Sequence, residues 1–212
     1  PTFINDLKYL FKIEKIAGKE SHYENKNIYY DTFDYKFYRE KSEGSSIRKK
    51  IRIRISNYFK DLKISRSQIE VKNRRGFDSD KDVFNIENLE KFKYEKLNEY
   101  LLDNYNVYLK EKLLPLIYTK YERKSFISNI YNDFRFTIDT NIITSSYNQN
   151  TKIHNKGFFI IDPNYSILEF KLGGSIPLFL KNVINKYYLE QVTFSKYARS
   201  IELLYEKQYK LN

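Results

Sequence analysis

The chain has no cysteine, no methionine and no tryptophan, and its two histidines are His22 and His154. Without cysteine, disulfides, thiolate metal sites and a cysteine nucleophile are excluded. Both histidines lie in polar, turn-like stretches, so we expect their side chains at the surface, which argues against a zinc site or a histidine-based catalytic triad. Because no apolar run approaches the roughly 20 residues of a membrane-spanning helix, we expect no membrane span.

Acidic residues are outnumbered by basic ones. The 212 residues include 38 Lys and Arg and 27 Asp and Glu, which gives 38 − 27 = +11. Such a surplus favours anionic partners, namely nucleic acids, phosphate compounds or acidic lipids, without choosing among them. The length suits one domain with a sizeable core, and neither a linker nor a repeat divides the chain. We therefore expect a single domain over residues 1–212.

One short basic run organises the rest of the sequence. Read with the period of a β-strand, its cations fall on one face and its isoleucines on the other. The cations are Arg48, Lys50, Arg52 and Arg54. Cations about 6–7 Å apart along one face repel each other unless an anion or facing carboxylates neutralise them. A half-buried strand with its polar face in water would carry the same pattern.

Four other segments show the same alternation of a charged face and an apolar face. Their charged pairs are Asp6 and Lys8, Glu70 and Lys72, Arg135 and Asp139, and Glu169 and Lys171. The expected strands are residues 3–16, 27–33, 47–57, 67–72, 116–127, 133–142, 158–161 and 166–172. A short helical or irregular stretch is expected at residues 39–44, one or two helices within 86–111, and further helices at 177–189 and 193–210. Loops are expected at 17–26 and 144–157, with a basic turn at 73–76.

These patterns predict an α+β fold, specifically an antiparallel β-barrel of about eight strands with a charged lumen and helices over its apolar outside. The alternative is an open sheet with one solvated face. Burying many charges inside a barrel costs free energy unless the charges pair or bind ions and phosphates. A charged lumen would therefore be a wet, functional tunnel.

Nine motifs carry a family resemblance. In order they are DLKYL (6–10), IYYDT (28–32), REK (39–41), KIRIR (50–54), IEVK (69–72), YER (121–123), RFTID (135–139), LEFK (168–171) and SKY (195–197). With them the chain resembles the vacuolar transporter chaperone (VTC) polyphosphate polymerase domain, one of the triphosphate tunnel metalloenzymes. The CYTH triphosphatases of that group open with Glu-x-Glu-x-Lys. Here INDLK lacks the first glutamate, which favours the polymerase.

The resemblance implies an ATP-dependent polyphosphate polymerase that transfers the γ-phosphate of ATP to a growing chain in a basic tunnel. Its expected partners are ATP, pyrophosphate and polyphosphate, and its expected cofactor is Mn²⁺ or Mg²⁺. The implied phosphate-binding and catalytic residues are Lys8, Arg52, Arg54, Lys72, Arg123, Arg135, Lys171 and Lys196. The implied metal ligand is Glu169, with Glu70 and Asp139 as weaker candidates.

Two other functions remain open at this point: a metal-dependent triphosphatase of the same fold, and a non-catalytic module that binds polyphosphate or RNA. The 21 tyrosines would suit base stacking. Because the aromatics fall on the strand faces opposite the charges, core packing is the better interpretation, and nucleic acid is not expected as a partner. The oligomeric state stays open. We expect a cytoplasmic location, or the cytoplasmic face of a membrane if the chain is part of a longer protein.

Four of the motifs also have structural interpretations. Ordinary cross-strand ion pairs would explain the Glu70/Lys72 and Glu169/Lys171 motifs. Ser195 is a plausible helix N-cap, which is compatible with a tunnel-facing Lys196. Asp31 and Thr32 are expected to be structural.

Overall fold

The computed structural model describes residues 2–16, 18–59, 64–131, 133–148 and 157–209. Its core is a nine-stranded antiparallel sheet in the order β10-β9-β8-β4-β5-β6-β7, with β1 paired to β8 and β11 to β9. The strands are β1 (Phe11–Ile13), β4 (His22–Asp31), β5 (Ile47–Phe59), β6 (Ile64–Arg75), β7 (Asp78–Asn85), β8 (Leu114–Ser128), β9 (Arg135–Ser146), β10 (Phe158–Phe159) and β11 (Ile167–Lys171). A separate small hairpin joins β2 (Lys15–Ile16) to β3 (Lys19–Glu20).

Six helical segments accompany the sheet in the described part of the chain. They are α1 (Thr2–Leu7), α2 (Lys36–Ser42), the 3-10 helix η1 (Tyr94–Lys96), α3 (Leu97–Tyr105), α4 (Leu178–Lys186) and α5 (Lys196–Tyr209). No helix in the described ranges is both long and apolar enough to cross a membrane.

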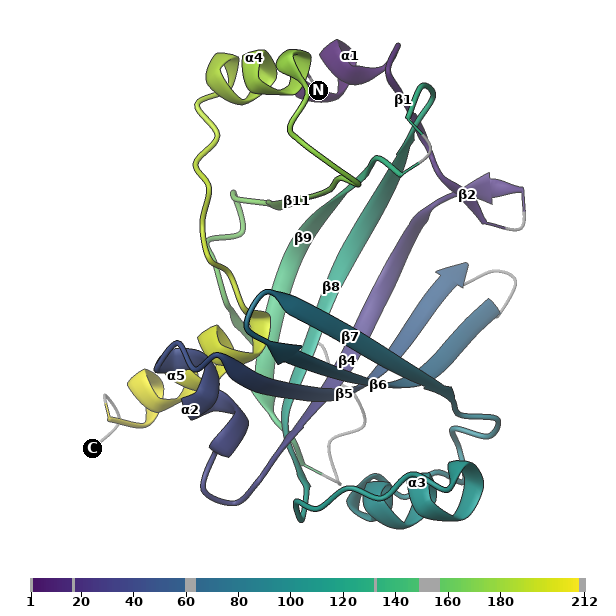
Figure 1. Cartoon of the computed structure of the whole chain (residues 1–212), viewed down its shortest axis with the longest axis vertical. Coiled ribbons are helices and arrows are strands. Elements are labelled where there is room, and N and C mark those ends of the chain that lie inside the picture. The colour runs from purple at the N-terminus through teal and green to yellow at the C-terminus, as the bar shows by residue number, and fades with distance from the viewer. Residues whose placement is uncertain (1, 17, 60–63, 132, 149–156, 210–212) are drawn as a thin grey trace.

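The sheet consists of two arms that share the almost fully buried strand β4. One arm is β5-β6-β7 and the other is β8-β9 with β11, and the two run in clearly different directions in Figure 1. The register places Tyr29 opposite Arg52 on one side and opposite Ile117 on the other. Because directly opposed residues in an antiparallel sheet share a face, this register carries one continuous face from β6 across to β11. We call it the inner face.

The outer face is apolar and covered by helices, as the alternation predicted. On the β5 arm, Ile51, Ile53 and Ile69 are at most 1% exposed and pack with Leu97 and Leu101 of α3. On the β9 arm, a second core joins α1 and α4 to the outer faces of β8, β9 and β11. Its buried members are Leu7, Phe11, Phe126, Phe134, Phe136 and Leu180.

Helix α5 packs at one end of the inner face. Its Tyr197 and Ile201 are buried against Tyr29 and Ile117. Asp31, at the end of β4, helps to fix this arrangement, because its carboxylate accepts hydrogen bonds from the Tyr197 hydroxyl at 2.5 Å and from two backbone N–H groups of α2 at 2.9 Å. These N–H groups have no partner within their own helix. The structural role expected for Asp31 is confirmed.

The closed barrel expected from the sequence is not confirmed. In the part of the chain that the structure describes, β7 and β11 end the two arms without pairing to each other. β7 is exposed along nearly its whole length and carries three aspartates, whereas β11 has five residues. Short, charged strands are typical of sheet edges that stay unpaired. The fold is therefore an open antiparallel sheet with helices. The predicted α+β class is confirmed, whereas the predicted barrel is not.

Several element boundaries also differ from the prediction. Residues 3–16 do not form one strand, because α1 precedes β1, and residues 22–26 belong to β4 rather than to a loop. β7 was not predicted, the helix within 86–111 is limited to residues 94–105, and β9 continues to Ser146. Residues 149–156 of the expected loop, including His154, lie outside the described residues. His22 is exposed, as expected.

Candidate anion-binding site on the inner face

The β5 arm places two arginines around one buried carboxylate. Glu70 of β6 is 4% exposed and lies opposite Arg52 of β5. The Arg52 guanidinium lies 2.6 Å from Glu70, while Lys81 of β7 lies at 3.2 Å and Arg54 at 3.6 Å. Burial alone would raise the pKa of Glu70, but Arg52, Arg54 and Lys81 outweigh it and lower the pKa to about 2. Glu70 is therefore ionised and holds these cations together.

The floor beside this cluster is polar and holds Arg54 in place. The Arg54 Nε–H donates to Asn25 at 3.0 Å and to the Ser56 hydroxyl at 3.1 Å. Asn25 is fully buried on β4, and its side-chain oxygen also accepts from Ser56 at 2.7 Å. Arg54 thus keeps its Nε anchored to the sheet, which orients the rest of its guanidinium.

The β8-β9 arm carries a second cluster around Asp139. Two nitrogens of Arg123 donate to its two carboxylate oxygens at 2.6 and 2.7 Å, and the Lys196 ammonium donates at 2.7 Å. Burial would raise the pKa of Asp139, but hydrogen bonds and charge from Arg123 and Lys196 lower it. Lys196 comes from the first turn of α5, where the Ser195 hydroxyl accepts from the Ala198 N–H at 3.3 Å. Ser195 therefore caps α5 as expected, and Lys196 reaches Asp139 on the inner face.

Tyr29 and Tyr121 lie between the two clusters. The Tyr29 hydroxyl lies 3.5 Å from an Arg52 nitrogen, and the Lys50 ammonium lies 4.9 Å from the centre of the Tyr29 ring. The Lys196 ammonium lies 4.6 Å from the centre of the Tyr121 ring. These aromatic side chains are each 1% exposed and bring cations of both arms around one region.

The ionisation of Tyr29 reflects these neighbours. Burial would raise the pKa of its hydroxyl, but the cations Lys50, Arg52 and Lys196 outweigh burial and lower the pKa to about 8. The phenolate therefore accumulates at pH values where an ordinary tyrosine stays neutral. An ionised Tyr29 would neutralise part of the cluster and compete with any bound anion.

We predict that tripolyphosphate binding by the wild-type chain weakens by up to roughly tenfold between about pH 7 and pH 9, because bound anion and phenolate exclude one another. The Tyr29→Phe variant should bind with a much flatter pH dependence. Calorimetric titration measures the affinity, and ultraviolet difference absorbance reports tyrosinate, whose formation should shift to higher pH when ligand is bound. If Tyr29→Phe keeps the full loss of affinity, another group is responsible. Lys50 is the first such group to consider, because burial lowers the pKa of its ammonium.

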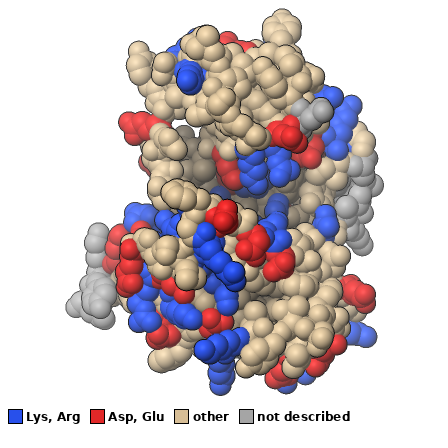
Figure 2. All heavy atoms as spheres, viewed as in Figure 1, with Lys and Arg blue, Asp and Glu red and all other residues tan. Residues whose placement is uncertain are grey.

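The structure places most of the predicted site residues on the inner face. Arg52, Arg54, Glu70, Arg123, Asp139 and Lys196 form the two clusters above. The register puts Lys72 opposite Lys50, and Glu169 and Lys171 opposite Thr137 and Arg135. Burial lowers the pKa of the Lys171 ammonium, and the positive charges of Arg135, Arg123 and Lys81 lower it further. Because Lys81 belongs to β7 and Lys171 to β11, cations of the two arms act on one another. Figure 2 shows a hollow in this region with basic and acidic side chains around it.

Lys8 lies elsewhere. It follows α1 in a turn, is exposed, and stands 4.9 Å from the centre of the Tyr9 ring. On β1, Lys12 pairs with Ile127, which in turn opposes Arg135 on β9. The register therefore places Lys12 on the inner face, whereas Lys8 belongs to no strand of the sheet.

The three predicted metal ligands do not form one cluster. Within the described residues, no group of three or more His, Asp or Glu side chains is placed to hold a metal ion. Glu70 and Asp139 are engaged by cations, whereas Glu169 is 47% exposed and has only long contacts, 3.8 Å to Arg123 and 3.7 Å to Lys171. Mg²⁺ in phosphoryl-transfer sites is often held by one or two carboxylates together with substrate phosphates. A metal bound in this way fits Glu169.

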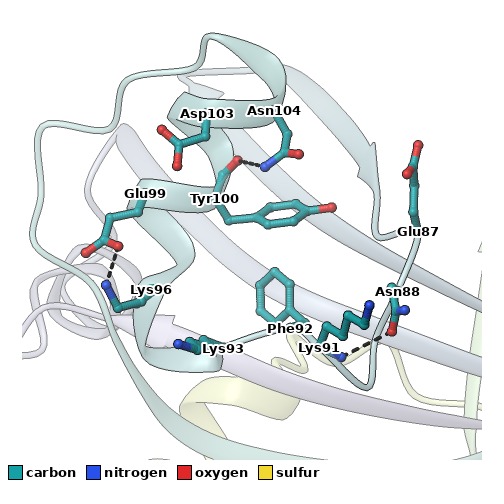
Figure 3. A pocket seen from close by; sticks show the side chains of 10 residues that line it. All are labelled: Glu87, Asn88, Lys91, Phe92, Lys93, Lys96, Glu99, Tyr100, Asp103 and Asn104. Atoms are coloured by element: carbon teal, nitrogen blue, oxygen red, sulfur yellow. Dashed lines mark hydrogen bonds and ion pairs between the residues drawn. The ribbon is translucent and has the colours of Figure 1, made fainter.

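A separate pocket of about 320 Å³ lies between α3 and the segment before η1. Figure 3 shows the rings of Phe92 and Tyr100 in it, with the Lys96–Glu99 ion pair near one side. Lysines and carboxylates both line this pocket, so it has no clear preference for an anion. It belongs to the helix that covers the outer face and is not part of the inner-face clusters.

Sequence reasoning missed Tyr29, Asn25 and Lys81 as parts of the site. Asn25 fell in the loop expected at residues 17–26, so it was not assigned to a strand face. Tyr29 fell in the expected strand 27–33, but the sequence could not indicate that its face is the charged one, because that depends on the register with β5. Lys81 was missed together with its strand.

The structure is thus an open antiparallel sheet with cation-rich clusters on its inner face. The chain matches the family model of the VTC domain over residues 3–205, nearly its whole length, and so belongs to the VTC domain family. This match confirms the family resemblance given by the nine motifs. The comparison with curated proteins found no match.

Proposed function

We propose that the chain is an ATP-dependent polyphosphate polymerase that elongates a phosphate chain on the inner face. Its family links it to polyphosphate synthesis. The observation that supports the proposal best is the gathering of cations from three elements around Tyr29 and Tyr121. Arg52 of β5 and Lys196 of α5 both act on the Tyr29 hydroxyl, and Lys196 and Arg123 of β8 both lie over the Tyr121 ring. Arginine matches two phosphate oxygens at once, and lysine supplies a compact charge. Two arms lined in this way suit an elongated phosphate chain, which would lie in the open trough between them.

In the proposed reaction, an oxygen of the terminal phosphate of the chain attacks the γ-phosphorus of ATP. The bond between the γ-phosphorus and the bridging oxygen breaks, and ADP leaves with that oxygen. Phosphoryl transfer depends mainly on positioning and charge stabilisation. An anionic phosphate nucleophile needs no strong general base, so the reaction does not require a histidine. A bound Mn²⁺ or Mg²⁺ would supply further positive charge, with Glu169 as its protein ligand.

Product analysis tests this proposal. The purified chain is incubated with ATP and Mn²⁺, with and without pyrophosphate as primer, and ADP, orthophosphate and polyphosphate are measured together. Equal amounts of ADP and phosphate transferred into polymer are expected, with faster synthesis when primer is present. Equal ADP and orthophosphate without polymer would instead identify a triphosphatase, and binding without turnover would identify a phosphate-binding module.

A further inference from the structure

The basic row of β5 is neutralised over only half of its length. The half of the row near the two clusters, Arg52 and Arg54, lies against Glu70. The outer half faces other cations, because Lys50 lies directly opposite Lys72 and Arg48 directly opposite Arg74 on β6. Like charges directly opposite each other across two strands are destabilising. Two successive pairs of this kind are therefore a cost to the folded chain when no anion is bound.

The neighbours of these four cations do not remove the repulsion. Among the residues that the structure describes, none of the four forms an ion pair with a carboxylate. Besides Tyr29, the charged groups that act on Lys50 are the cations Arg52, Lys196 and Lys72. The Nε–H of Arg74 donates to the Gly76 carbonyl at 2.8 Å, which leaves its charge without a counter-ion. Lys72 and Arg74 are exposed, so an anion in solution can reach them.

The outer row is continuous with the candidate site. Lys50 contacts the Tyr29 ring, and the β4–β5 pairing ends at Tyr30 and Ile51, so residues 47–50 run beyond the edge of β4. From there the row leads to the β6–β7 turn at Gly76, whose φ of +63° favours glycine. A ligand that begins between Arg52 and Lys196 and is long enough would meet Lys50 and Lys72 next, and then Arg48 and Arg74.

We propose an outer subsite for inorganic polyphosphate, formed by Arg48, Lys50, Lys72 and Arg74. It lies on the inner face of the sheet, beyond the two clusters, and binds the part of the chain that extends past them. This inference rests on the proposed function and adds chain-length preference to it. A short phosphate compound fills only the inner clusters, whereas a long chain also neutralises the two repelling pairs. Single-stranded RNA is a less suitable occupant, because its binding uses successive aromatic stacking platforms. Tyr29, beside Lys50, is buried, which leaves Phe77 in the β6–β7 turn as an exposed ring at the far end of the row.

Neighbouring arginines on β6 provide a matched test. Arg74 and Arg75 are both exposed but point to opposite faces, with Arg75 opposite Ile47. Affinities for tripolyphosphate and for a long polyphosphate are measured without metal at several salt concentrations. We expect Arg74→Gln to weaken long-chain binding by roughly threefold to tenfold. The slope of log affinity against log salt concentration should also become shallower by about one, because one counter-ion fewer is released. Tripolyphosphate binding should stay within about twofold, and Arg75→Gln should resemble wild type for both ligands.

The outcomes separate the two proposals. If Arg74→Gln and Arg75→Gln have the same effect on the long chain while tripolyphosphate binds, the outer subsite is wrong and the proposed function stands. If the wild-type chain binds neither ligand, both proposals are wrong. The same titration with poly(U) completes the test, because Arg74-dependent RNA binding as tight as that of polyphosphate would overturn the choice of ligand. Urea unfolding of each variant verifies that the chain remains folded.

Discussion

The Glu169→Gln variant is expected to lose metal-dependent turnover by about 100-fold or more while it still binds tripolyphosphate in the absence of metal. Glu169 is half exposed on β11, and its contacts to Arg123 and Lys171 are both longer than 3.5 Å. Its removal therefore leaves no buried charge unpaired, and the fold should tolerate it. Loss of the carboxylate removes the one predicted metal ligand that is not already engaged by close cations.

Glu122→Gln is the matched control for this experiment. Glu122 is exposed to a similar extent, 45%, but lies on the outer face of β8, where it contacts His22 at 3.4 Å. This control should keep both turnover and binding. Turnover that persists in Glu169→Gln would show that the metal assignment is wrong, whereas loss of metal-independent binding would make Glu169 a structural residue.

The second large effect is expected for Glu70→Gln, which should lower the free energy of unfolding at pH 7 by about 2–4 kcal/mol. The amide cannot neutralise Arg52, Arg54 and Lys81, so three cations would repel each other on the inner face. Because Glu70 no longer competes for the arginines, the folded variant should bind tripolyphosphate more tightly than wild type. Reduced stability together with increased affinity distinguishes this effect from general damage to the site.

The pH dependence of stability gives an independent check of Glu70. Its pKa in the fold is about 2, below the ordinary value of 4.5. A carboxyl group with a depressed pKa stabilises the fold fully above its unfolded pKa, and this contribution is lost as pH falls from about 4.5 to 2. Urea unfolding from pH 7 down to pH 3 should therefore show a smaller loss of stability for Glu70→Gln than for wild type. Equal acid sensitivity of the two proteins would contradict the ion-pair account.

The alternation of charged and apolar residues was enough to predict the two faces of the sheet. On β5, the isoleucines are buried under α3 and the arginines reach the inner face, as the period of two required. The same holds for Phe136 and Asp139 on β9. Local alternation sets which face each side chain occupies, so these assignments did not depend on long-range contacts.

Other features depended on contacts that a local pattern does not contain. The Asp6/Lys8 alternation predicted a strand, but Leu7 is buried with α4, and Asp6 accepts from Lys186 at 2.5 Å, so α1 forms against that helix. β7 lacks an apolar alternation because it is an exposed edge. Closure of the sheet depends on whether two distant edges meet, and the proximity of Tyr29 to Lys196 depends on the packing of α5. Tertiary packing between distant segments decided these points.

A crystal structure of the chain bound to tripolyphosphate would test the central claim most directly, namely that the inner face between the two arms binds phosphates. The account predicts phosphate groups in contact with Arg52, Arg123 and Lys196, between β5 and the first turn of α5. Phosphates found only on outer-face lysines or in the pocket beside α3, with the inner face free of ligand, would contradict it.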